Sequence, residues 1–101
     1  MEIIVKHKNF ETGAMEAVAK VDVTELYSLS RMDQLEYAYR WTNNIEGSWS
    51  RKLGGDANDA VTVLTKRADG LGLRSTSMFD RMEIDGVEYE VAMFGFEKVA
   101  A

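Results

Sequence analysis

The feature that most constrains this fold is Asp85-Gly86, which lies between two segments of alternating polar and apolar residues. An Asp-Gly pair in this setting favours a two-residue type I′ turn, because both central residues of that turn need positive φ. Pairing Ile84 with Val87 then places Met82 opposite Tyr89 on a mostly apolar face. A slip of one residue would turn that face to solvent, so the sequence specifies the register of the hairpin.

The opposite face of the predicted hairpin is charged. In the same register Glu83 faces Glu88, and Arg81 faces Glu90. Two interpretations are open: a solvated outer face, or an acidic patch for a basic partner. After the hairpin, Gly95 stands between two phenylalanines, which predicts a bulge or a close backbone approach.

Two other runs, residues 2–8 and 16–23, alternate with the two-residue period of a strand, and a polar segment containing Gly13 joins them. This pattern predicts an antiparallel pair. Shorter strands are predicted over residues 60–65 and, with a weaker pattern, over residues 71–75.

One main helix is predicted after Ser30, which begins a variant of the capping box with Asp33 in place of the preferred glutamate. We expect this helix to run to about Asn44. Its predicted core stripe follows helical spacing and consists of Leu35, Ala38, Tyr39, Thr42 and Ile45. The fold class is therefore α+β, an antiparallel sheet of about five strands with one helix on a face, in a single domain over residues 1–101.

Composition narrows the function. The chain has no cysteine, which excludes disulfides and thiolate chemistry, and no apolar stretch or leader pattern of the kind that membranes and secretion require. We therefore expect a soluble, cytoplasmic protein. A net charge of −5 disfavours nucleic-acid binding, which depends on phosphate neutralisation. Residues 48–81, in contrast, carry a net positive charge. Their candidate anion or nucleic-acid contacts are Arg51, Lys52, Lys66, Arg67 and Arg74.

Catalytic equipment is sparse in this sequence. His7 is the single histidine, and its alternation with Ile3 and Val5 indicates a structural or surface role. We expect no catalytic residues, no cofactor and no metal, and hence no enzyme, although paired carboxylates remain open. The run 74–77 (Arg-Ser-Thr-Ser) allows two interpretations: turn hydroxyls with an arginine paired to a carboxylate, or a site for a partner's phosphate or carboxylate.

The aromatic residues supply the contact candidates. Tyr37 and Trp41 are four residues apart and lie to one side of the predicted core stripe. Either the helix is buried on a wide face, or this pair is partly exposed and forms a binding surface. Trp49 stands alone in the glycine-rich, polar segment 47–59 and is a third candidate.

Two stretches of the sequence carry a resemblance. Residues 73–80 (Leu-Arg-Ser-Thr-Ser-Met-Phe-Asp) precede the Asp-Gly turn, a tyrosine-bearing strand and a Gly-Phe pair. Upstream, a pattern Ala-Tyr-x-x-Thr-x-Asn-Ile-x-x-x-Trp is formed by Ala38, Tyr39, Thr42, Asn44, Ile45 and Trp49. Over roughly residues 35–97, with a variable centre, the chain resembles small orphan proteins of bacteriophages and plasmids. It departs from them at Phe79, where glycine is usual, and this predicts a different turn geometry.

The resemblance implies an origin more than an activity. It implies a phage-type accessory protein that binds a host protein in the host cytoplasm and modulates or inhibits it, without catalysis. The predicted partner contacts are the three aromatics Tyr37, Trp41 and Trp49 and the acidic face of Glu83, Glu88 and Glu90. The alternative is a nucleic-acid-binding module that uses the basic segment 51–81, and a homodimer is compatible with either.

Overall fold

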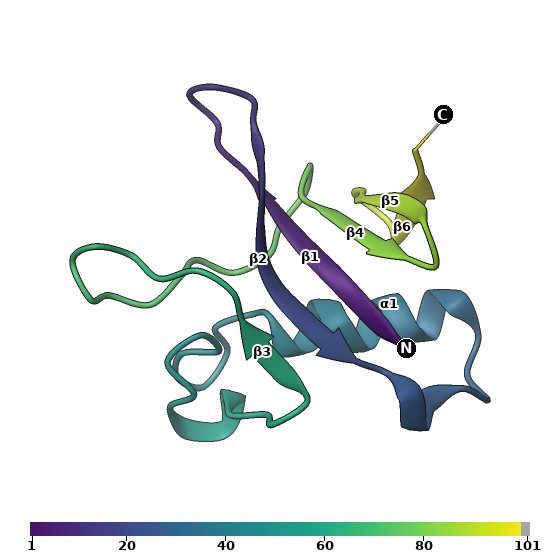
Figure 1. Cartoon of the computed structure of the whole chain (residues 1–101), viewed down its shortest axis with the longest axis horizontal. Coiled ribbons are helices and arrows are strands. Elements are labelled where there is room, and N and C mark those ends of the chain that lie inside the picture. Colours follow the sequence, from purple (N-terminus) through teal and green to yellow (C-terminus); the bar gives the residue numbers. More distant parts are fainter. Residues whose placement is uncertain (100–101) are drawn as a thin grey trace.

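The computed structural model describes residues 1–99 and contains one antiparallel sheet of six strands and one α-helix. The strands are β1 (Glu2–Lys8), β2 (Met15–Asp22), β3 (Val61–Val63), β4 (Arg81–Ile84), β5 (Val87–Val91) and β6 (Phe96–Lys98). They follow the order β3-β2-β1-β4-β5-β6, and α1 (Arg31–Trp41) runs across one face of the sheet (Figure 1). Short 3₁₀ turns follow β2 and precede β3, at Thr24–Leu26 and Gly54–Asp56. The predicted α+β fold is confirmed.

The β4–β5 hairpin has the register that the sequence predicts. Ile84 pairs with Val87, and the remaining pairs follow from this one. The turn residues Asp85 and Gly86 have φ values of 52° and 77°, as a type I′ turn requires. Met82 and Ile84 are buried, so the apolar face of the hairpin forms part of the core.

The central pair β1–β2 contains a bulge that the alternation of the sequence does not predict. Val5 pairs with Ala19 but the next residue, Lys6, pairs with Ala17, which leaves Val18 without a partner. An extra residue of this kind shifts the side-chain alternation of its strand. As a result Val18 and Ala19 are both buried, while Ala17 is exposed.

Helix α1 begins as predicted and ends early. The Ser30 Oγ accepts a hydrogen bond of 3.1 Å from the Asp33 backbone N–H, which confirms the cap. The helix ends at Trp41, because Thr42 leaves the helical conformation with φ −116° and ψ 32°. Among the described residues, no helix has the length and apolar character needed to cross a bilayer.

The early end of α1 changes the predicted core stripe. Leu35, Ala38 and Thr42 are buried, as expected. Ile45 is 62% exposed, so its assignment to the core is wrong. The reason is that helical spacing no longer applies beyond Trp41, where the chain leaves the helical conformation.

Gly95 is neither a strand bulge nor a point of close backbone approach. It lies in the turn between β5 and β6, where the Ala92 N–H donates to the Gly95 carbonyl at 3.0 Å. Its φ of 72° is in the left-handed region, and no atom lies within 4 Å of the position that a Cβ would take. Glycine is favoured here by backbone conformation rather than by space.

Candidate functional site

The two sequence stretches that carry the resemblance meet in the folded chain. Thr76 and Thr42 are joined by a backbone hydrogen bond of 2.9 Å and by their hydroxyls at 2.8 Å. Asn44 donates its backbone N–H to the Ser75 Oγ and its side-chain amide to the Leu73 carbonyl. These hydrogen bonds give backbone groups of segment 73–76 their partners without a neighbouring strand. This explains why the strand predicted over residues 71–75 is absent.

Trp49 completes this contact from inside the protein. Its side chain is 1% exposed, and its indole N–H donates to the Arg74 carbonyl at 2.9 Å. Its backbone N–H donates to the Asn44 side chain, and its ring meets the His7 ring edge-on at 6.1 Å. The prediction that Trp49 is a partner contact is therefore wrong, because the residue fills the core.

Asp80 is the anionic centre of the same region. It is fully buried and receives both terminal nitrogens of Arg74, at 2.6 and 2.8 Å, and the backbone N–H groups of Lys8 and Ser77. Burial alone would raise the pKa of Asp80, but these hydrogen bonds hold it below its ordinary value. Arg74 is thus paired with an internal carboxylate, as the structural interpretation of the run 74–77 expects.

His7 lies at one end of a directional chain of hydrogen bonds. The Thr42 hydroxyl donates to the Ala38 carbonyl, and the Thr76 hydroxyl donates to Thr42, so the His7 Nε2–H donates to the Thr76 Oγ at 2.8 Å. Burial lowers the pKa of His7 from 6.5 to about 4, although the Asp80 carboxylate at 3.9 Å acts in the opposite direction. We call the whole set the polar lock: Thr42, Asn44, Trp49, Arg74, Thr76, Asp80 and His7.

A second buried carboxylate, Asp56, fixes the chain that follows α1. One oxygen accepts the successive backbone N–H groups of Ile45, Glu46 and Gly47 at 2.7–2.9 Å, and the other accepts from Arg40 at 3.2 Å. Burial would raise the pKa of Asp56, but these donors hold it below its ordinary value. No sequence pattern indicates this arrangement, because an isolated aspartate in a polar loop is unremarkable.

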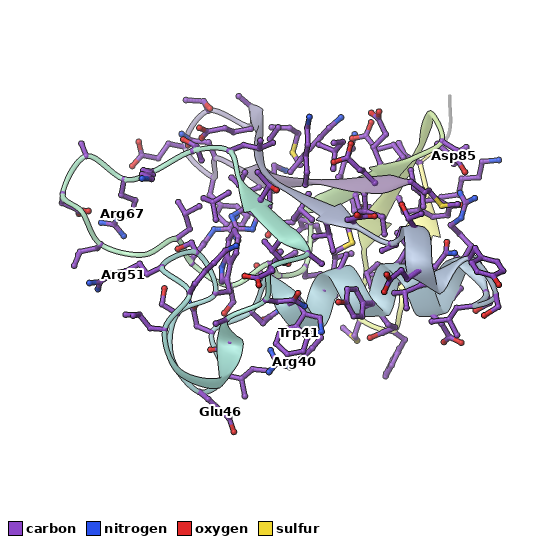
Figure 2. The ribbon with its side chains drawn as sticks, turned by 60° about the horizontal axis from the view of Figure 1, so that its bottom comes forward. Arg40, Trp41, Glu46, Arg51, Arg67 and Asp85 are labelled. Carbon is purple, nitrogen blue, oxygen red and sulfur yellow. The ribbon has the colours of Figure 1, made fainter. Side chains whose placement is uncertain are left out.

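The aromatic pair on α1 lies at the rim of the core. Tyr37 and Trp41 are both half-buried, and their rings are tilted against each other at 6.3 Å. The Arg40 guanidinium lies 4.2 Å from the centre of the Trp41 ring, and Figure 2 shows the two side chains together on the helix. The Tyr37 hydroxyl accepts a hydrogen bond from the Asn58 amide. The pair is thus partly exposed and held in place by its neighbours.

Beside Tyr37 lies a hollow of about 470 Å³ whose charged lining is acidic. Its carboxylates are Asp22, Glu25 and Asp59, and none of them forms an ion pair within residues 1–99. Hydrogen bonds from the side chain and the backbone of Thr24 lower the pKa of Asp22. Sequence reasoning missed this acidic hollow (Asp22, Glu25, Asp59 and Tyr37), because β2–β3 pairing brings its members together.

The hairpin face that was predicted to be acidic carries both acidic and basic side chains, which form ion pairs. The Lys6 ammonium lies 3.0 Å from Glu83 and 3.8 Å from Glu88. Arg81 lies 3.7 Å from Glu88 and 3.6 Å from Glu90. Lys6 comes from β1, next to the hairpin in the sheet, so hairpin sequence alone does not reveal it. Cations therefore compensate this face.

The structure gathers part of the basic segment. Arg51, Lys66 and Arg67 line a hollow of about 420 Å³. Figure 2 shows Arg51 and Arg67 on two loops at the same end of the molecule. Lys52 is exposed and is not part of that lining, and Arg74 pairs with Asp80 in the polar lock. We call this site the basic hollow.

Within residues 1–99, no three histidine, aspartate or glutamate side chains come close enough together to hold a metal ion. Comparison with family models, curated proteins and solved structures gives no match for the chain.

Proposed function

We propose that this protein acts by binding another protein through the α1 aromatic pair and the acidic hollow beside it. One observation carries this proposal: the half-buried Tyr37–Trp41 pair adjoins a hollow with three carboxylates. None of these carboxylates forms an ion pair within residues 1–99. Tyrosine, tryptophan and arginine dominate the energetic centres of interfaces, and Arg40 is already fixed by Asp56 and Trp41. A pre-ordered surface loses less side-chain entropy on binding.

The chemistry of the surface specifies the partner. Three carboxylates around a hollow of about 470 Å³ suit a lysine or arginine side chain, and within residues 1–99 no lysine or arginine lines this hollow. The Met1 ammonium lies beside it and donates to the Thr24 Oγ at 2.7 Å, so a bound cation would share the site with this charge. The adjoining aromatic rings suit the apolar stem of that residue or an apolar neighbour. We therefore expect a partner that presents a basic residue next to an apolar one.

This proposal keeps the role that the resemblance implies. It assigns the electrostatic contact to the acidic hollow instead of the hairpin face of Glu83, Glu88 and Glu90. An accessory protein of the phage type would bind a host protein and modulate it, without catalysis of its own. Glu83, Glu88 and Glu90 are less suited to the electrostatic role, because Lys6 and Arg81 already compensate them. The net charge of −5 favours encounter with a basic surface.

The test is capture of a partner from a nuclease-treated bacterial lysate by tagged protein and its variants. Asp59→Lys and Trp41→Ala should lose the protein that the wild type captures, because they remove the charge and the ring from the proposed surface. Glu97→Lys makes the same charge change at an exposed position on β6 and is the matched control. Circular dichroism and Tm must show that each variant is folded. Equal capture by wild type and Asp59→Lys would contradict the proposal, and so would an equal loss with Glu97→Lys.

A nucleic-acid-binding module is the second candidate, and the observation that favours it is the basic hollow. Three of the five predicted contacts, Arg51, Lys66 and Arg67, lie together there. This candidate predicts binding to DNA or RNA that weakens steeply with salt and with the double substitution Lys66→Gln/Arg67→Gln. The net charge opposes it, because a long phosphate backbone would also pass over acidic surface.

A further inference from the structure

The basic hollow has walls that the fold holds in place. Arg51 comes from the loop after Trp49, and Lys66 and Arg67 come from the loop after β3. The two loops are tied by a hydrogen bond of 2.7 Å from the Leu73 N–H to the Ser50 Oγ. At Gly72 they are so close that a Cβ would lie 2.5 Å from the Ser48 Oγ.

The positive charge of this hollow is largely uncompensated. Arg51 and Lys66 form no ion pair among the residues that the structure describes, 1–99. Arg67 contacts Asp69 at 2.6 Å through one nitrogen, and both side chains are about half exposed. An exposed pair of this kind contributes little to stability, so Arg67 can exchange it for a ligand at small cost. Three cations thus face the hollow.

The remaining lining is of two kinds. Ser50 and Thr65 add hydroxyls beside the cations. The apolar part consists of Val63, Leu71 and Leu73, and Leu71 is 57% exposed. The volume of about 420 Å³ lies within the range of about 300–1,000 Å³ that small-ligand sites occupy. Cations with hydroxyls suit a phosphate, and the leucines suit a flat apolar ring.

We propose that the basic hollow binds a nucleoside mono- or diphosphate. Arg51, Lys66 and Arg67 hold the phosphate, and Leu71 and Leu73 lie against the base. A compact ligand fits the charge distribution better than a long strand does, because the net charge is −5 and screening confines the local positive field to about 8 Å at physiological salt. This inference does not depend on the proposed protein partner, since the two sites share no residues.

The test is a titration of isotope-labelled full-length protein with ADP, followed through backbone amide resonances. We expect saturable shifts at Ser50, Arg51 and residues 64–71, complete below about 1 mM ADP. Adenosine and inorganic phosphate, titrated separately, should each bind about tenfold more weakly or worse, because each engages half of the site.

Three variants assign the contacts. The double substitution Lys66→Gln/Arg67→Gln should weaken ADP binding about tenfold or more, because it removes two charge-assisted donors. Lys52→Gln makes a similar change at an exposed residue next to Arg51 but outside the hollow, and it should leave ADP affinity unchanged. Leu71→Ser should weaken ADP binding and leave the affinity for inorganic phosphate as it was. The substituted residues are exposed, so the variants should keep the wild-type Tm.

Four outcomes would overturn the inference. The first is that ADP leaves the amide resonances unchanged, and the second is that Lys52→Gln weakens binding as much as the double variant does. Inorganic phosphate binding as tightly as ADP would show a plain anion site in which the leucines have no role. Binding of a short single-stranded oligonucleotide, with no binding of ADP, would favour the nucleic-acid module instead.

Discussion

Asp80 and Asp59 show how differently this fold treats two carboxylates. Asp80 is buried in the polar lock and receives hydrogen bonds from Arg74, Lys8 and Ser77. Asp59 is exposed at the acidic hollow and forms no ion pair within residues 1–99. Only the second is free to meet a ligand's charge without breaking an internal bond.

The same contrast separates the cations. Arg74 belongs to the run 74–77 that carries the resemblance, and its guanidinium holds Asp80 with both terminal nitrogens. Lys66 lies outside that run and faces a hollow. A prominent polar motif therefore indicated how the chain holds itself together, and the charges suited to binding lie in segments with no motif at all.

The largest expected effect comes from removing the inner carboxylate. Asp80→Ala leaves Arg74 and two backbone N–H groups without their acceptor, and it should lower the free energy of unfolding by about 3–5 kcal/mol. Asp59→Ala removes a solvated charge and should change it by less than about 0.5 kcal/mol. Urea unfolding followed by circular dichroism measures both. Equal effects of the two substitutions would show that the inner and outer carboxylates do not differ as the contacts indicate.

Acid should weaken the polar lock through His7. Because the folded-state pKa is about 4 against an ordinary 6.5, the unfolded chain binds the proton more readily between these values. The stability due to neutral His7 is therefore present above pH 6.5 and is lost as pH falls towards 4, by at most about 3 kcal/mol. Asp80, Arg74 and Glu16 are the charged groups that act on it.

Urea midpoints measured across this range check the acid effect. His7→Gln keeps a donor for Thr76 but cannot titrate, so its stability should change less with pH than that of the wild type. The same slope in both proteins would assign the acid sensitivity to carboxylates elsewhere in the chain.

The sequence predicts best where the determinants are local. The β4–β5 register follows from Asp85-Gly86 and the period of two, and both lie within one short segment. The helix cap at Ser30 is equally local. The bulge at Val18 was missed, because both neighbours are apolar too and the alternation gives no sign of the extra residue.

The site was less predictable, because its members are brought together by pairing over long distances. Asp22 and Asp59 meet at one hollow through the pairing of β2 with β3, which no spacing in the sequence encodes. Trp49 lies in a polar segment and yet is buried, since its ring and indole N–H find partners in segment 73–76 and in His7. The polarity of a segment reflects the neighbours of a residue along the chain, whereas its burial depends on the neighbours in space.

The buried Trp49 and the half-buried Trp41 allow the same comparison between an inner and an outer residue, with smaller expected effects on stability. Trp49→Phe loses the hydrogen bond to the Arg74 carbonyl and part of the core volume, and should cost about 2 kcal/mol. Trp41→Phe changes a half-buried ring at the rim and should cost less than about 1 kcal/mol. Thermal and urea unfolding of the two variants measure this difference. In the capture experiment the order should reverse, with Trp41→Phe the more damaging; a larger loss of capture from folded Trp49→Phe would contradict the site assignment.

The smallest expected effect concerns Phe79, in the turn before β4. Its φ is 77°, in the left-handed region that favours glycine, so the phenylalanine adopts a backbone conformation that is strained for a residue with a Cβ. Its ring is 49% exposed and lies 5.8 Å from the Lys8 ammonium. Phe79 directly precedes Asp80 of the polar lock.

Phe79→Gly should therefore stabilise the protein slightly. Relief of left-handed strain gives about 1–2 kcal/mol, and the greater freedom of glycine in the unfolded chain takes back about 0.5–1 kcal/mol, which leaves a gain of about 0.5–1 kcal/mol. Phe79→Ala is the matched control, because it also removes the ring but keeps the Cβ that causes the strain. Urea unfolding should rank glycine above phenylalanine and alanine. If alanine stabilises the protein as much as glycine does, the ring rather than the backbone is the source of the effect.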